Sequence, residues 1–204
     1  MSAGMPIREA VAVLRNARGP DDIVVSSMGS AREWMSLGPL HDLDFVLVPS
    51  AMGHATSLGL GLSLAQPERR VIVLSGDGSL LMNLGSLVTI SAHSPERLVV
   101  VVFVNGVYEV TGGQVTPRNQ GMPVDYVAMA RASGITSVFQ WSVLDDWQSG
   151  VAEALGAAGP TVVILDVAPI PGAVGPRSPG PTTARAERFM AALNLPKRTT
   201  KDVK

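Results

Sequence analysis

The sequence predicts an α/β fold with a mostly parallel central sheet and helices on both of its faces. Apolar runs rich in β-branched residues recur along the chain, and helix-like patterns separate one run from the next. Runs such as "LVVVVFV" at 98–104 are apolar throughout, which is typical of parallel strands covered on both faces. Strands that alternate with helices in this way form a parallel sheet through right-handed crossovers.

Each strand and helix follows from this alternation, in chain order. We expect strands at 22–27, 44–48, 70–76, 98–105 and 161–167. We expect helices at about 5–17, 30–37, 53–66, 80–93, 123–133 and 144–158. Together these elements are expected to form one domain over residues 1–168.

The composition changes after residue 168. The segment "APIPGAVGPRSPGPTTARAER" is rich in Pro and Gly, which predicts an extended backbone. The pattern of "TARAERFMAALN" predicts a short helix after it. Residues 169–204 are therefore expected to form an extended C-terminal arm that carries this helix.

The composition also limits the partners of the chain. It has 204 residues, of which 46% are apolar and only 16% are charged. A soluble domain usually has about 25% charged residues, so we expect a partner to cover part of this surface. The net charge is −1, which argues against nucleic-acid binding because nucleic-acid-binding domains carry a basic patch.

The absence of cysteine excludes several kinds of site. Disulfides, thiolate metal sites, Fe–S clusters and cysteine nucleophiles all need this side chain. The N-terminal residues "MSAGMPIREAVAVLRNARG" carry charges among the apolar positions, unlike a signal peptide. The longest apolar run is too short to span a bilayer. We expect a soluble, cytoplasmic protein that does not associate with membranes.

The stretch "LSGDGSLLMNLGSL" places Asp77 between two glycines, where a buried strand ends and a helix begins. In open α/β sheets, ligands bind at the carboxyl ends of the strands. Glycines let the backbone approach a ligand, and free N–H groups at a helix start favour an anion such as phosphate. A carboxylate repels an anion unless a cation lies between them, so the pattern predicts Mg²⁺ between Asp77 and a phosphate. Asp-Gly is also a common turn dipeptide, so the motif alone is weak evidence.

A second metal-ligand type ends the next strand. Asn105 directly follows the apolar run at 98–104 and precedes a glycine. Its side-chain amide oxygen is a hard, neutral metal ligand. Two neighbouring parallel strands would then direct Asp77 and Asn105 toward one ion.

The GDG motif followed by this Asn resembles the signature of thiamine-diphosphate (ThDP) enzymes. Three segments are similar to the cofactor-binding half of the sulfopyruvate and phosphonopyruvate decarboxylases: "SAMGHATSLGLGLSLA", "VIVLSGDGSLLMNLGSL" and "NGVYEVTGGQVTP". "SSMGSAREW" resembles their loop on the diphosphate side, and "GPTTARAERFMAAL" resembles their C-terminal arm. The resemblance covers most of residues 22–194 and implies the ThDP-binding fold.

The resemblance assigns a set of residues to the cofactor ThDP and to Mg²⁺. Asp77, Asn105 and the backbone oxygen of Val107 correspond to the metal ligands. The cofactor-binding positions lie in several loops. They are Gly29, Ser30, Ala31, Ser50, Met52, Gly76, Asp77, Gly78, Ser79, Asn105, Val107, Tyr108 and Glu109.

Met52 and His54 are the candidate catalytic residues. Met52 corresponds to the apolar residue that separates the two cofactor rings and bends the cofactor, although methionines more often fill core space. The carbonyl of Ser50 would accept the 4′-amino proton of the bent cofactor. His54 either donates a proton in the site or caps the helix that it starts. Tyr108 stands where the family often has His, which leaves the substrate open.

The resemblance implies the diphosphate-binding subunit of a two-subunit ThDP-dependent 2-oxo acid decarboxylase, which releases CO₂ and an aldehyde. A pyrimidine-binding partner subunit would supply the catalytic glutamate, in an α₂β₂ or larger hetero-oligomer. The substrate would be a small 2-oxo acid of the sulfopyruvate or phosphonopyruvate type. Arg32 and Arg118 are candidates to contact its second anionic group.

The sequence is also compatible with other functions. The chain could belong to a carboligase of the acetolactate-synthase type, or it could be a non-catalytic subunit that binds ThDP and regulates a partner. A subunit of a ferredoxin-linked oxidoreductase usually carries cluster cysteines, which this chain lacks. A dinucleotide- or nucleotide-binding domain lacks support, because no G-x-G-x-x-G follows the first strand and no P-loop occurs.

Overall fold

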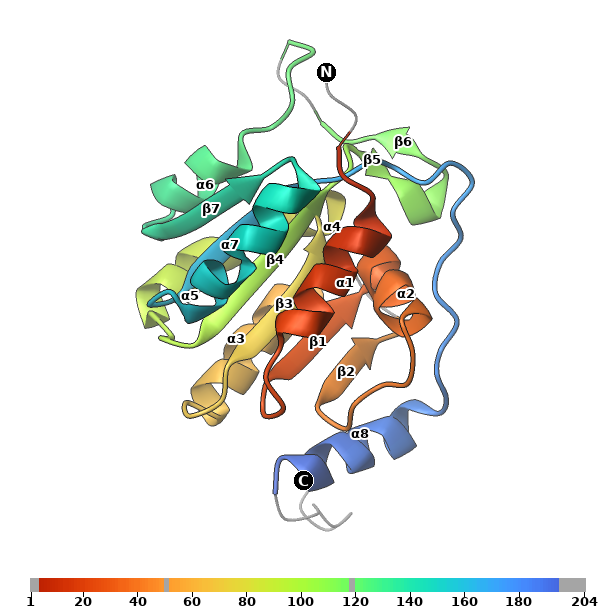
Figure 1. Cartoon of the computed structure of the whole chain (residues 1–204), viewed down its shortest axis with the longest axis vertical. Helices are drawn as coiled ribbons and strands as arrows, with labels where there is room; N and C mark the ends of the chain where they lie inside the picture. The colour runs from red at the N-terminus through yellow and green to blue at the C-terminus, as the bar shows by residue number, and fades with distance from the viewer. Residues whose placement is uncertain (1–3, 50–51, 118–119, 195–204) are drawn as a thin grey trace.

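A parallel six-stranded sheet forms the centre of the molecule (Figure 1). The computed structural model describes residues 4–49, 52–117 and 120–194. The strand order is β2-β1-β3-β4-β8-β7, and every pairing between neighbours is parallel. The strands are β1 (Ile23–Ser27), β2 (Asp44–Leu47), β3 (Val71–Gly76), β4 (Leu98–Val104), β7 (Ser137–Trp141) and β8 (Thr161–Asp166).

Helices cover both faces of this sheet (Figure 1). One face is covered by α1 (Ile7–Ala17), α2 (Met28–Ser36) and α7 (Leu144–Gly156). The opposite face is covered by α3 (His54–Ala65), α5 (Ser86–His93) and α6 (Tyr126–Ala132). This arrangement confirms the predicted fold class.

Short elements follow the two central strands. The helix α4 (Asp77–Leu81) begins directly after β3. After β4, the strands β5 (Val107–Tyr108) and β6 (Gln114–Val115) form a small antiparallel hairpin around the 3₁₀ helix η1 (Glu109–Thr111).

The core consists of two apolar clusters, one on each face of the sheet. Successive side chains of a strand point to opposite faces, so neighbouring residues enter different clusters. Ile72 packs with Trp34 and Trp147 on the α1 side, whereas Val73 and Val100 pack on the α3 side. Both faces exclude water, which explains why the central strands read as continuous apolar runs.

Every predicted strand is present, with ends within one residue of the predicted ones. The strand β7 is not among the predictions. It lies at the edge of the sheet and its side chains are half-buried or exposed, so "SVFQW" lacks the continuous apolar pattern of the central strands.

The single helix predicted over 80–93 is wrong in its extent. The chain forms α4 and α5 instead, with a turn at 82–85 between them. In this turn, the side chain of Asn83 donates hydrogen bonds to the carbonyl of Gly53 at 2.8 Å and to Ser57 Oγ at 3.1 Å. The turn therefore links α4 to the segment that precedes α3.

The order of the strands creates a crevice at the carboxyl edge of the sheet. The strand β1 lies between β2 and β3, so the chain moves to one side after β1 and returns to the other side before β3. In open α/β sheets, ligands bind at such a switch point, outside the carboxyl ends of the strands. The helices α2 and α4 begin directly after β1 and β3, and their first turns carry Gly29–Ser30 and Asp77–Ser79.

The segment that follows β8 runs along the outside of the molecule, past α2 to the end of β2 (Figure 1). There the helix α8 (Thr182–Ala192) packs on β2, with the rings of Phe189 and Phe45 5.1 Å apart. In the described part of the chain, no helix has the length and apolar character needed to cross a bilayer.

Candidate functional site

A pocket opens at the carboxyl ends of β1, β3 and β4, at the switch point. It brings together most of the residues that the sequence assigned to the cofactor and the metal. Predicted residues that line it are Gly29, Ser30, Met52, Gly76, Asp77, Gly78, Ser79, Asn105, Val107, Tyr108 and Glu109. The remaining lining residues were not predicted and are Ile7, Met28, Phe103, Val110 and Thr111.

Asp77 is a buried carboxylate at the first position of α4, with 1% of its surface exposed. Its Oδ2 accepts a hydrogen bond of 3.1 Å from the N–H of Gly106, in the loop after β4. No Lys, Arg or His among the described residues pairs with it. Burial raises the pKa of Asp77 from 3.8 to about 6, although backbone N–H groups partly oppose this shift. The carboxylate is therefore placed where a cation would lower its free energy.

Asn105 follows β4, the strand that neighbours β3. Its Oδ1 accepts a hydrogen bond of 3.0 Å from the N–H of Val107, and its Nδ2 donates one of 3.4 Å to Glu109 Oε1. The two bonds fix which end of the amide is the oxygen, and that oxygen keeps a second lone pair for a ligand. Carboxylate and amide oxygens from adjacent strands form a donor set that suits Mg²⁺.

Two glycines make room for side chains that line the pocket. A Cβ on Gly78 would lie 2.6 Å from the Tyr108 ring, and a Cβ on Gly29 would lie 3.3 Å from Glu109 Oε2. Tyr108 and Glu109 both come from the loop after Asn105, so this loop packs directly on both glycine-containing loops. The close approach leaves backbone groups of Gly29 and Gly78 facing the pocket without side chains of their own.

The predicted residues Ser30 and Ala31 differ in their surroundings. The hydroxyl of Ser30 lies at the pocket wall, and it can donate to the carbonyls of Ser27 at 2.7 Å or Leu74 at 3.0 Å. It therefore ties the ends of β1 and β3 together. Ala31 is fully buried beside Val46 and does not line the pocket.

Met52 lines the pocket and is held through its neighbour Gly53. The N–H of Gly53 donates to Ser79 Oγ at 2.9 Å, and the carbonyl of Gly53 accepts from Asn83 Nδ2 at 2.8 Å. Gly53 has a φ of 86°, a left-handed conformation that favours glycine. The GDG motif and the Met52 segment are therefore one hydrogen-bonded unit.

His54 lies at the start of α3 with its side chain exposed. Its Nδ1 is 3.2 Å from the carbonyl of Met52, and it is not among the residues that line the pocket. Its catalytic role remains a prediction. The predicted residues Ser50 and Arg118 lie outside the described residues.

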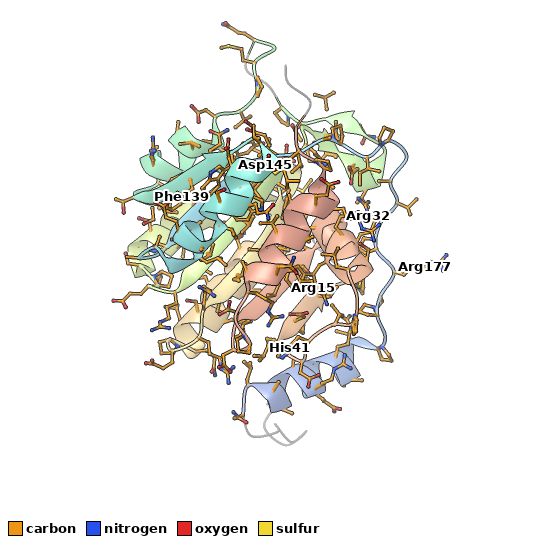
Figure 2. The ribbon with its side chains drawn as sticks, viewed as in Figure 1. Arg15, Arg32, His41, Phe139, Asp145 and Arg177 are labelled. Atoms are coloured by element: carbon orange, nitrogen blue, oxygen red, sulfur yellow. The ribbon has the colours of Figure 1, made fainter. Side chains whose placement is uncertain are left out.

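Arg32, which the sequence made a candidate to contact the substrate, already has three hydrogen-bond partners. Its guanidinium donates to Glu33 Oε1 at 2.7 Å, to Glu109 Oε2 at 2.8 Å and to the carbonyl of Val174 at 3.1 Å. Figure 2 shows Arg32 on α2 beside the C-terminal arm. Both carboxylates raise the pKa of Arg32 against the effect of burial.

Glu109 joins three parts of the site. Its Oε2 pairs with Arg32, and its Oε1 accepts from Asn105 and also from the N–H of Ile170 at 2.7 Å. Ile170 belongs to the C-terminal arm, so one carboxylate links α2, the Asn105 loop and the arm. Sequence reasoning assigned Glu109 to the cofactor without a role. These contacts depend on residues far apart in the chain, so the sequence alone could not show them.

Tyr126 is a polar residue near Asp77 that sequence reasoning missed. Its hydroxyl is buried and has no hydrogen-bond partner among the described residues. Burial, followed by the charges of Asp77 and Tyr108, raises the pKa of Tyr126. Nothing in the pattern of the predicted helix at 123–133 marks this position as special.

Comparison with known proteins identifies a family that this chain matches and several relatives. Residues 22–165 match the family described as "Thiamine pyrophosphate enzyme, C-terminal TPP binding domain". A phosphonopyruvate decarboxylase of Streptomyces viridochromogenes is 43% identical over 199 residues, which cover 96% of this chain and 48% of that protein. The chain thus spans about half the length of that relative.

A second relative is closer to this chain in length. The sulfopyruvate decarboxylase subunit beta of Methanothermobacter thermautotrophicus is 40% identical over 152 residues, which cover 73% of this chain and 75% of that protein. Among solved structures, the thiamine diphosphate-dependent 4-hydroxybenzoylformate decarboxylase of Rhodococcus jostii RHA1 has a TM-score of 0.69 at 22% identity. That match covers 83% of this chain and 34% of the solved chain, and it supports the fold alone.

Proposed function

The chain belongs to the thiamine pyrophosphate enzymes, whose C-terminal TPP-binding domain matches residues 22–165, and on that premise we propose that it holds thiamine pyrophosphate (ThDP) together with Mg²⁺. It would act as the diphosphate-binding subunit of a 2-oxo acid decarboxylase of the sulfopyruvate or phosphonopyruvate type. One observation carries the proposal. Asp77 is a buried carboxylate that no described side chain neutralises, and it lies beside the amide of Asn105 at the switch point of the sheet.

The residues of the pocket fit the cofactor and its metal. Asp77 and Asn105 would hold Mg²⁺ through side-chain oxygens, and Val107 through its carbonyl. The backbone N–H groups near Gly29 and Gly78 would hold the diphosphate, because these glycines line the pocket at the starts of α2 and α4. Met52, which lines the same pocket, would lie between the two cofactor rings.

The cofactor supplies the carbanion chemistry of decarboxylation when it is bound. The residues of the chain bind it, orient it and exclude water. Ser79 and Asn83 hold Gly53, the neighbour of Met52, so Met52 would be placed relative to α4 if it lies between the cofactor rings. Phe103, Met28 and Ile7 give the pocket an apolar wall.

A partner subunit would complete the site by supplying the pyrimidine-binding half and its glutamate. Two observations support a partner. The relative from Methanothermobacter is named subunit beta, and the chain covers 75% of its length. Several large apolar side chains of the described residues are also exposed near α3 and α5, among them Leu64 (49%), Met82 (57%) and Val88 (58%). We expect an α₂β₂ or larger assembly, and we expect it in the cytoplasm.

The substrate would be a 2-oxo acid with a second anionic group. Such a group needs cationic contacts. Arg32 is already paired with Glu33 and Glu109. The cation for the second anionic group would therefore come from the partner or from Arg118.

The test is to combine the full chain with its pyrimidine-binding partner and saturating ThDP and Mg²⁺. Sulfopyruvate, phosphonopyruvate and pyruvate are then compared as substrates by CO₂ release and by product analysis. We expect release of CO₂ and an aldehyde from one of the first two acids. Activity should fall at least about 100-fold when Mg²⁺ is removed with a chelator, because the metal holds the diphosphate.

The other outcomes favour other functions. An acyloin product would show a carboligase of the acetolactate-synthase type. Binding of ThDP without turnover of any 2-oxo acid would favour a regulatory subunit. Failure of the complex to bind ThDP at all would overturn the proposal.

A further inference from the structure

Arg185 on α8 is a buried cation whose partners are backbone and hydroxyl oxygens. It is 8% exposed and forms no ion pair with a carboxylate among the described residues. Its guanidinium donates to the carbonyls of Val46 and Val48, to that of Gly180 at 3.2 Å and to Thr182 Oγ1 at 3.2 Å. A buried charge without a counter-charge is costly unless its hydrogen-bonding groups are satisfied. The position of this arginine therefore calls for an explanation.

The two carbonyls lie at the carboxyl end of β2, which is the edge strand of the sheet. Leu43 accepts a hydrogen bond from Val24 of β1, so the carbonyl of Val46 is out of phase with it and faces away from β1. That carbonyl also accepts from the N–H of Val48 at 3.0 Å, so Arg185 holds the last turn of the chain at the end of β2 through Val46 and Val48. In the sequence, Arg185 is separated from Val46 by 139 positions and from Val48 by 137 positions.

The end of β2 leads directly to the cofactor pocket. Only positions 49–52 separate Val48 from Gly53, and Met52 lines the pocket. Gly53 is already held by Ser79 and Asn83. The carbonyl that Arg185 holds at Val48 is therefore only four positions before Met52 in the chain.

We propose that Arg185 is a positioning residue for the Met52 segment. It would act through the end of β2 and would not touch the cofactor. The importance of Met52 for ThDP binding rests on the proposed function, whereas the hold of Arg185 on Val46 and Val48 rests on the contacts above. The helix α8 lies beyond the residues 22–165 that match the family, so the cofactor domain would depend on a part of the chain outside it.

A simpler role for Arg185 would be to attach α8 to the sheet. The helix has a second attachment in Phe189, whose ring packs 5.1 Å from that of Phe45 on β2. Phe189 packs on β2 through its ring, whereas Arg185 bonds to the carbonyls at 46 and 48, so the two attachments can be weakened separately. Phe189→Leu is therefore the control for loose docking of α8.

The first experiment measures hydrogen–deuterium exchange on the full chain without cofactor. We expect Arg185→Lys to speed the exchange of amides at 52–56 by about fivefold, because local opening becomes more frequent. Arg188→Met is a second control, since Arg188 lies on the same helix, is exposed and only approaches Asp42 at 3.8 Å. Both controls should stay within about twofold of the wild type at these amides.

The second experiment measures the dissociation constant of ThDP at saturating Mg²⁺ for the chain in complex with its partner. A misplacement of about 1 Å in a site can cost up to about 100-fold, so we expect a rise of about tenfold for Arg185→Lys. Arg185→Met should behave in the same way where it folds. The controls should again stay within about twofold of the wild type.

The outcomes separate the two roles and the two proposals. If Phe189→Leu speeds exchange at 52–56 as much as Arg185→Lys at a matched loss of melting temperature, Arg185 only attaches α8 and the inference is overturned. Unchanged exchange in Arg185→Lys overturns it as well. If the wild-type complex binds no ThDP, the proposed function fails, and the exchange data alone decide the positioning role.

Discussion

At the scale of single residues, Asp77 destabilises the folded chain until a cation reaches it. Its folded-state pKa of about 6 lies above its ordinary value of 3.8, so the folded chain holds the proton more tightly than the unfolded chain does. The ionised carboxylate therefore costs up to about 3 kcal/mol above about pH 6. This cost falls as the pH is lowered through about 6 and is absent below about 4, where both states are protonated.

Asp77→Asn should therefore stabilise the chain and abolish its response to metal. We expect the free energy of unfolding without metal to rise by about 2–3 kcal/mol at pH 7, and by less at pH 5. The Asn oxygen can still accept from Gly106, so that hydrogen bond is retained. Denaturant unfolding at both pH values, in the presence of a chelator, measures the change.

A matched control is Asp166→Asn, at the end of β8. It should leave the stabilisation by Mg²⁺ and ThDP as large as in the wild type. If Mg²⁺ and ThDP stabilise Asp77→Asn as strongly as the wild type, the metal does not bind where we place it.

The effect of Glu109 on Asn105 can be separated from its pairing with Arg32, because another glutamate pairs with the same arginine. Glu109→Gln turns one acceptor into a donor, so Asn105, Ile170 or Arg32 loses its partner. Mutation of a residue that orients a metal ligand typically weakens metal binding by about 10-fold or more. We expect Glu109→Gln to weaken Mg²⁺ binding about tenfold in a titration at saturating ThDP.

The control is Glu33→Gln, which removes the same charge from the same arginine without reaching Asn105. It should shift the Mg²⁺ affinity by no more than about twofold. Equal effects of the two variants would mean that Arg32, and not the orientation of Asn105, governs the metal site.

At the scale of elements, α3 packs on β3 at a distance that only glycine allows. A Cβ on Gly59 would lie 2.1 Å from Val73 Cγ2, whereas a Cβ on Gly61 would meet no atom within 4 Å. Gly59→Ala should therefore destabilise the isolated chain by about 1–3 kcal/mol through overpacking. Gly61→Ala should stabilise it by up to about 1 kcal/mol, because alanine favours the helix.

The denaturation midpoints of these two variants should move in opposite directions from that of the wild type. Two destabilised variants would indicate that helix α3 tolerates no added side chain at either position. Two stabilised variants would show that α3 lies farther from β3 than the structure has it.

The elements differ in how far the sequence could predict them, and burial explains the difference. The strands β3 and β4 lie between two apolar layers, so their pattern is unbroken and their ends are predicted within one residue. The edge strand β7 has no such pattern. The break between α4 and α5 carries the contact of Asn83 with Gly53, a tertiary contact that no local pattern shows.

At the scale of the whole molecule, the sequence predicted the members of the site better than their connections. Local motifs indicate Asp77 and Asn105, the resemblance to the family indicates Met52, and the structure gathers all three at one pocket. The pairing of Arg32 with Glu109 and the hold of Arg185 on β2 join distant parts of the chain. Local patterns and a resemblance to a family carry no information on such contacts, so these could only be found in the folded chain.

The cover that α8 places over β2 also affects how molecules meet. An uncovered edge strand offers unpaired carbonyl and N–H groups, to which a strand of another molecule can add. Here Arg185 occupies the carbonyls of Val46 and Val48, and Phe189 packs on the same strand. The C-terminal helix thus covers this border of the sheet, where a strand of another molecule could otherwise add.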